Sequence, residues 1–67
     1  MISKHVDADG EVTFYMDEDA EVNTLPTMDK SGTVNGKKMD CASHGDKALS
    51  IYTGTIFILG SKGWAEQ

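Results

Sequence analysis

Three acidic side chains near the start of the chain have a spacing that could hold a hard cation. Asp7, Asp9 and Glu11 alternate along the chain, and carboxylate oxygens are the ligands that Ca²⁺ prefers. An EF-hand calcium loop needs further oxygen ligands and a glutamate at its twelfth position. Glu18 stands twelfth from Asp7, but it belongs to an acidic run, and strand-forming residues fill the places between. The pattern therefore favours a turn over a metal site.

Cys41 and His44 are the second group that could do chemistry, as a nucleophile and its base. Asp40 or Asp46 is available to orient the histidine. Such pairs normally come from separate elements and act in a sheltered cleft, whereas these residues share one polar stretch of a small chain. We therefore predict no catalytic residues and no enzymatic activity.

Metal and cofactor binding are not expected either. Cys41 and His44 supply two zinc ligands at most, and His5 lies far away in the sequence. A structural zinc site needs four converging ligands. We predict no metal site and no cofactor.

The length of the chain limits how much core it can form. A chain of 67 residues buries only about 60% of its unfolded surface. A single core of this size contributes about 3–5 kcal/mol. Cys41 is the only cysteine, so an internal disulfide is excluded and association with itself or with a larger protein is the expected stabiliser.

Charge is divided unevenly along the chain. Residues 1–29 carry eight acidic residues against one lysine, a net charge of −7, whereas residues 30–67 carry five lysines against three acidic residues, a net charge of +2. The acidic first half argues against direct binding to nucleic acid. No apolar run approaches the ~20 residues of a membrane span, and the start lacks the layout of a signal peptide. The free cysteine fits synthesis in a reducing cytoplasm.

The clearest structural signal is a β-hairpin over residues 47–59. Two β-rich runs flank Thr53 and Gly54, which suits a two-residue turn. A three-residue loop with Gly54 in a bulge would shift one strand by a residue, and this alternative stays open. The two-residue turn pairs four apolar residues on one face, which we expect to be the core: Ile51 with Ile56, and Leu49 with Ile58.

The opposite face of this hairpin is also too apolar to meet only water. Its largest side chains are Tyr52, Phe57 and Leu59, and we predict that they bind a protein partner. Trp64 follows the tight turn after the hairpin, from where it can swing across the predicted core face. We expect Trp64 to act as a lid over that core.

The first part of the chain gives weaker signals. Residues 5–16 favour a second hairpin, so residues 1–19 are predicted to form an N-terminal hairpin or docking arm. Leu25 is held extended by Pro26 and is expected to be a buried plug in an irregular segment. Residues 28–46 are polar and are predicted to form a long central loop.

This loop is expected to contain a short strand at Thr33 and Val34, before a turn at Asn35 and Gly36. The predicted fold class is therefore mainly β. We expect one small domain over residues 1–67, antiparallel and hairpin-based, with a long central loop.

A series of short motifs runs through residues 20–66: Leu25–Thr27, a loop rich in Gly, Ser and Lys, Gly45–Leu49, Tyr52–Gly54, Ile56–Leu59, and Gly60–Gly63 before Trp64. This series resembles small β-modules that tailed bacteriophages encode among their virion genes, of the head-fibre and capsid-decorating type. In those modules a stretch of Gly-Ser-x-Ala, Thr-Gly-x-hydrophobic-Tyr-hydrophobic and Gly-x-Trp recurs. Here Asp46 stands where Ser is commoner, and Phe57 where Tyr is commoner.

The resemblance implies a virion structural protein that attaches to a capsid, neck or tail protein as a decoration or fibre-base module. It fixes no catalytic or binding residue. It implies many copies per particle or a homo-oligomer, located in the virion and made in the host cytoplasm. The alternative is a small free-standing phage regulator or inhibitor that binds one partner protein through the same surface. Neither a nucleic acid nor a membrane is an expected partner.

Overall fold

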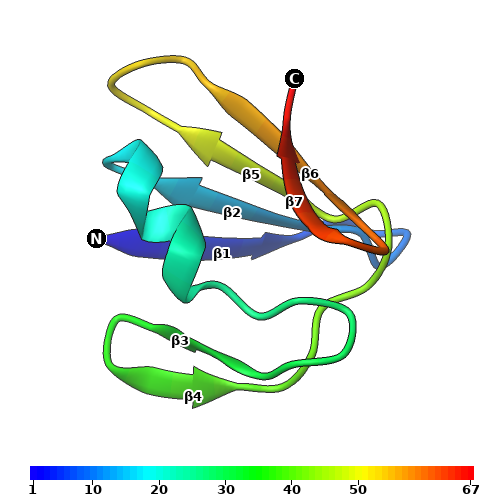
Figure 1. The fold of residues 1–67 in the computed structure, drawn as a ribbon. Coiled ribbons are helices and arrows are strands. Elements are labelled where there is room, and N and C mark those ends of the chain that lie inside the picture. Colours follow the sequence, from blue (N-terminus) through cyan, green and yellow to red (C-terminus); the bar gives the residue numbers. More distant parts are fainter.

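The structure is a computed structural model that describes residues 1–67, and most of its regular structure is short β-strands (Figure 1). Five strands form one sheet in the order β1-β2-β5-β6-β7, while β3 and β4 form a separate hairpin. The elements are β1 (Ile2–Val6), β2 (Val12–Met16), the 3-10 helix η1 (Asp19–Thr24), β3 (Gly32–Val34), β4 (Lys37–Met39), β5 (Lys47–Ser50), β6 (Ile56–Gly60) and β7 (Gly63–Glu66). No helix is long and apolar enough to cross a membrane.

The predicted mainly β fold, built from antiparallel hairpins, is confirmed. β1 and β2 pair around the turn that contains Gly10, whose φ is 91°. β3 and β4 pair around Asn35 and Gly36, whose φ angles of 51° and 79° are the two positive values of a type I′ turn. Both turns lie where the turn residues of the sequence place them, but β4, after Asn35 and Gly36, lies within the predicted long loop.

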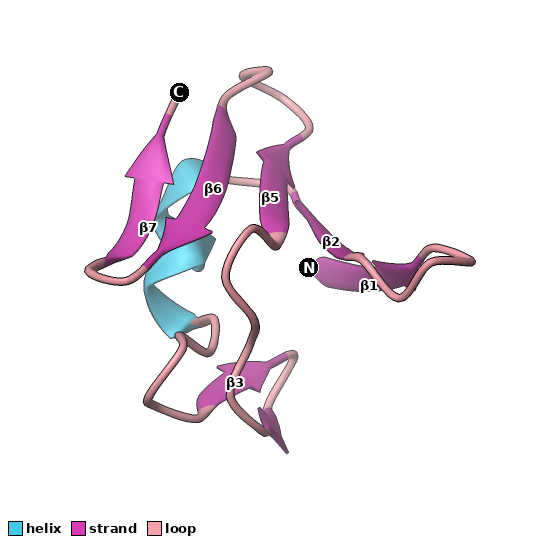
Figure 2. Cartoon of the chain, turned by 90° about the vertical axis from the view of Figure 1, so that its right-hand side faces the viewer, coloured by secondary structure: helices cyan, strands magenta, loops and turns pink.

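β2 and β5 pair in parallel, which the hairpin pattern does not predict. Parallel neighbours need a crossover connection, because the chain must return to the same end of the sheet. Here the crossover is residues 17–46, which include η1 and the β3–β4 hairpin. In Figures 1 and 2 these two elements lie beside the sheet rather than within it. The long polar stretch therefore provides the second layer of the fold.

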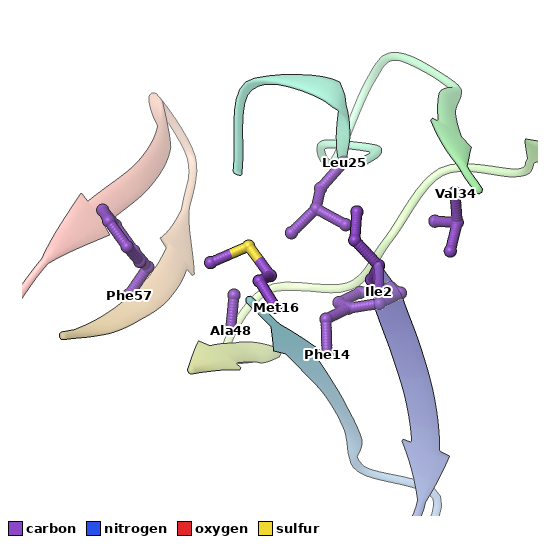
Figure 3. Close-up of a cluster of buried hydrophobic side chains, with 7 residues drawn as sticks. All are labelled: Ile2, Phe14, Met16, Leu25, Val34, Ala48 and Phe57. Atoms are coloured by element: carbon purple, nitrogen blue, oxygen red, sulfur yellow. The ribbon is translucent and has the colours of Figure 1, made fainter. Parts of the chain in front are cut away.

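The core lies between one face of the sheet and this crossover (Figure 3). We call this face the inner face. Side chains from the sheet meet Leu25 and Val34 of the crossover there, and Leu25 is 4% exposed, as expected for a buried plug. The seven buried residues of the cluster are Ile2, Phe14, Met16, Leu25, Val34, Ala48 and Phe57.

The β5–β6 hairpin has a longer loop than predicted. Leu49 pairs with Ile56, and Lys47 pairs with Ile58, a shift of two residues from the expected register. Ser50 donates its backbone N–H to the carbonyl of Thr55 over 2.8 Å, so four residues form the loop between them. The Gly54 N–H donates back to the Ser50 carbonyl over 2.9 Å. Gly54 adopts a φ of 74° there, which glycine accepts without strain.

The predicted core face of this hairpin is wrong. A shift of two residues leaves each side chain on its predicted face, but the buried face is the one that carries Ala48, Ser50, Phe57 and Leu59. The reason lies outside the hairpin. β2 adds Phe14 and Met16 to that face, and the crossover covers it. The face of β5 and β6 that carries Leu49, Ile56 and Ile58 is left uncovered.

Candidate interaction surface

We call the uncovered side of the five-stranded sheet the outer face. Because side chains alternate along a strand, the pairing registers place Tyr15, Leu49 and Ile56 side by side in one row across β2, β5 and β6. Tyr15 is 36% exposed and Ile56 44%. Ile58 adds to the apolar surface in the neighbouring row. The outer face thus presents a continuous apolar strip at its centre.

The loop between β5 and β6 extends this strip. Ile51 is 54% exposed and continues the outward alternation of β5. Tyr52, at the predicted partner-binding position, is 80% exposed at the tip of the loop. Both side chains are accessible to a partner.

Phe57 and Leu59 do not belong to this surface. Leu59 is fully buried and Phe57 is 8% exposed, because both point from β6 to the inner face. They cannot contact a partner while the chain keeps this fold. This corrects their predicted role, and places Tyr15, which the sequence analysis did not select, in the exposed strip instead. Its alternation with Phe14 and Met16 in β2 is the sequence signal that could have placed it there.

Charge is distributed asymmetrically between the two faces of the sheet. The strand residues whose side chains point to the outer face include no aspartate or glutamate, and Lys47 is the one lysine among them. Next to this face His5 Nε2 lies 3.4 Å from Asp7 Oδ1, and the His5 ring meets Tyr15 edge-on. A protein of net charge −5 therefore presents an apolar surface with a positive side chain.

Trp64 lies on the inner face, in a strand that the sequence analysis did not predict. β7 pairs with β6 through a two-residue connection, and Trp64 lies opposite Leu59. Its ring packs edge-on against Phe14 at 6.1 Å, and its Nε1 donates a hydrogen bond of 3.0 Å to the Pro26 carbonyl. Trp64 therefore covers the core at Phe14 and Pro26, and not the predicted set of Leu49, Ile51, Ile56 and Ile58.

Asp19 holds the β5–β6 loop against η1. Its carboxylate accepts hydrogen bonds from Thr53 Oγ1 at 2.6 Å and from Thr55 Oγ1 at 3.2 Å. The neighbouring hydroxyl groups of Ser50, Thr53 and Thr55 lower the pKa of Asp19 below its ordinary value. This carboxylate thus helps to position Ile51 and Tyr52.

We expect Asp19→Asn to weaken the fold at neutral pH and to lose this effect in acid. A carboxyl group whose pKa is lowered by folding stabilises the folded state above its unfolded pKa, near 3.8. That stabilisation disappears as the pH falls through the folded pKa. Urea unfolding of both proteins at pH 7 and at pH 2.5 measures the difference. A difference that persists unchanged at pH 2.5 would contradict this role of the charge.

Of the residues that the sequence singled out for chemistry, Asp46 is buried, whereas the three carboxylates of the first turn are exposed. The carboxylate oxygens of Asp7, Asp9 and Glu11 lie within 4.8 Å of one another at the β1–β2 turn. Exposed acidic groups of this kind are common without an ion. The structure thus gathers these three side chains, but at an open turn.

Cys41 and His44 are also exposed. Cys41 lines a cavity of about 350 Å³ between β1, β2 and the segment that follows β4, whereas His44 does not line it. Lys4, Lys38, Asp40 and Asp46 contribute two positive and two negative groups to the lining. The cavity therefore favours neither sign of ligand.

Comparison of the chain with protein families, with curated proteins and with solved structures gave no match.

Proposed function

We propose that this protein is a non-enzymatic structural module that attaches to a larger protein assembly through the outer face of its sheet. The observation that supports this most strongly is the apolar strip of Tyr15, Leu49 and Ile56, in which Tyr15 and Ile56 are exposed and Leu49 is half-buried. This small chain has few core residues, and apolar side chains that stay exposed to water contribute nothing to its stability through burial. A partner that covers them supplies that hydrophobic stabilisation.

The charge pattern suggests what kind of partner fits this face. The strip has Lys47 beside it and no carboxylate among the outward-pointing strand residues. A matching surface is apolar at its centre and carries a carboxylate opposite Lys47. Acidic groups of this chain lie mainly on η1 and the turns, where they keep the remaining surface hydrated.

The assembly that we propose is a tailed-phage particle, with this chain as a decoration or fibre-base module on its capsid, neck or tail. The resemblance of residues 20–66 to such modules supports this assignment. A free-standing regulator that binds one protein would use the same strip. The number of copies of the chain in purified particles distinguishes the two functions.

Quantitative mass spectrometry of purified particles of the phage whose genome encodes the chain tests the proposal. We expect the chain to copurify with the particles in a fixed ratio to the major capsid protein, at many copies each. A chain found only in the soluble lysate, bound to one protein, would overturn the structural role and support the regulator.

A further inference from the structure

Both edges of the five-stranded sheet are open, and their backbone groups can be identified. In β1, residues 3 and 5 face β2, because the flanking hydrogen bonds of Asp7 with Glu11 and of Asp17 with Met1 set the alternation. Lys4 and Val6 therefore direct their N–H and C=O groups away from the sheet. In β7, Gln67 bonds to Ile56, so Trp64 and Glu66 direct theirs away from the sheet.

One end of the β1 edge is already occupied. The side chain of Asn35, from the β3–β4 turn, accepts a hydrogen bond from the Ile2 N–H at 2.8 Å and donates one to the Ile2 carbonyl. It thus takes the place of a neighbouring strand at Ile2. The open part of β1 is limited to Lys4–Val6, which has the same length as the open segment 64–66 of β7.

We infer that β1 of one copy pairs with β7 of a second copy, antiparallel, with Lys4 opposite Glu66 and Val6 opposite Trp64. In this register all four residues direct their backbone groups into the new pair. The side chains also match in face, since Lys4 pairs with the inward-pointing Phe14 and Glu66 with the inward-pointing Phe57 in their own sheets.

Charge selects this combination of edges over the two others. Pairing two β1 edges with Lys4 opposite Lys4, or two β7 edges with Glu66 opposite Glu66, would place like charges together without a counter-charge. Like charges across a strand pair are destabilising, whereas opposite charges stabilise it. A single inward-pointing charge on an edge strand is a known device against edge pairing. Here the two edges carry opposite signs.

Strand direction agrees with this arrangement. β1 is antiparallel to β2, β2 is parallel to β5, and β5, β6 and β7 alternate, so β7 runs antiparallel to β1. A second copy in the same orientation therefore presents β7 to β1 in the antiparallel sense, with its crossover layer on the same side. Such a head-to-tail contact closes into a ring or continues as a filament. This contact refines the proposed function, in which many copies of the chain are present on one particle. It leaves the outer face of the sheet free for docking.

The test combines charge reversal with mixing. Lys4→Glu and Glu66→Lys should each weaken self-association by about tenfold, because each creates a like-charge pair. An equimolar mixture of the two variants should recover the wild-type affinity, because each contact between unlike copies restores one opposite-charge pair. Lys30→Glu, which changes the net charge as Lys4→Glu does but in an exposed loop, is the matched control for Lys4→Glu and should associate like the wild type.

Sedimentation equilibrium gives the affinity, and two-dimensional NMR of the wild-type chain shows which amides shift with concentration up to about 1 mM, the range of weak contacts. The amide signals of Val6 and Trp64 should shift. A chain that stays monomeric, a mixture that fails to recover, or a control that weakens association equally would each overturn the inference. Leu49→Lys combined with Ile56→Lys should associate normally, which separates this contact from docking through the outer face.

Discussion

Leu59→Ala is expected to unfold most of the protein. Leu59 is fully buried on the inner face of β6, and removing a buried leucine side chain costs about 2–5 kcal/mol. A domain of this size has only about 3–5 kcal/mol available from its core. The variant should therefore show a large unfolded fraction without denaturant, measured by circular dichroism and by urea unfolding followed through Trp64 fluorescence.

Ile56→Ala is the matched control for this experiment. Ile56 lies in the same strand, is also a large aliphatic residue, and is 44% exposed on the outer face. Its replacement should cost less than about 1 kcal/mol, as for an exposed position. The sequence pattern alone assigns these two residues the opposite roles. Equal losses of stability, or a greater loss for Ile56→Ala, would contradict the arrangement of faces described above.

Gly32→Ala is expected to be nearly as damaging, although it adds only one methyl group. A Cβ at Gly32 would lie 2.5 Å from the backbone carbon of Leu25 and 2.5 Å from the carbonyl oxygen of Thr24, and it would also overlap the nitrogen of Pro26. These are backbone atoms, so no side-chain rotation relieves the overlap. The β3–β4 hairpin would have to move away from the segment that carries Leu25.

We expect Gly32→Ala to lower the free energy of unfolding by about 3 kcal/mol or more, which is the upper end of the range for overpacked sites. Urea unfolding measures this loss. Gly60→Ala is the control, because a Cβ there would meet only the Gly63 carbonyl oxygen at an ordinary 3.8 Å and Gly60 has no positive φ. It should change stability by less than about 1 kcal/mol. A Gly32→Ala protein as stable as Gly60→Ala would show that the close approach of β3 to residues 24–26 is wrong.

Local features of this fold could be predicted from the sequence because they depend on a few adjacent residues. Asn35 and Gly36 tolerate positive φ and mark their turn, and Asp9 and Gly10 do the same for the first hairpin. Leu25 could be placed in the core because the following proline holds it extended beside polar neighbours. In each case the physical cause lies within the segment itself.

The features that could not be predicted depend on contacts between distant segments. The parallel pairing of β2 with β5 joins residues 34 positions apart in the sequence, and no turn residue indicates it. That pairing, with the crossover it requires, decides which face of β5 and β6 is covered. The burial of Phe57, Leu59 and Trp64 depends on which face the crossover covers. Because the predicted core face is the wrong one, the predicted partner-binding role of Phe57 and Leu59 and the predicted contacts of Trp64 are wrong as well.

The most direct test of the proposed docking surface measures how many copies of a variant with Leu49→Lys and Ile56→Lys are present in purified particles. Both substitutions place a charge in the exposed strip, and neither side chain is part of the buried cluster. Met28→Lys is the control for a lysine placed at another exposed apolar position, since Met28 is 40% exposed and lies in the crossover rather than in the sheet. Circular dichroism should first establish that both proteins fold.

Quantitative mass spectrometry of purified particles then gives the copy number of each protein relative to wild type. We predict that the double variant falls to background, because two desolvated charges oppose the apolar contact, while Met28→Lys is incorporated normally. Normal incorporation of the folded double variant would contradict docking through the outer face.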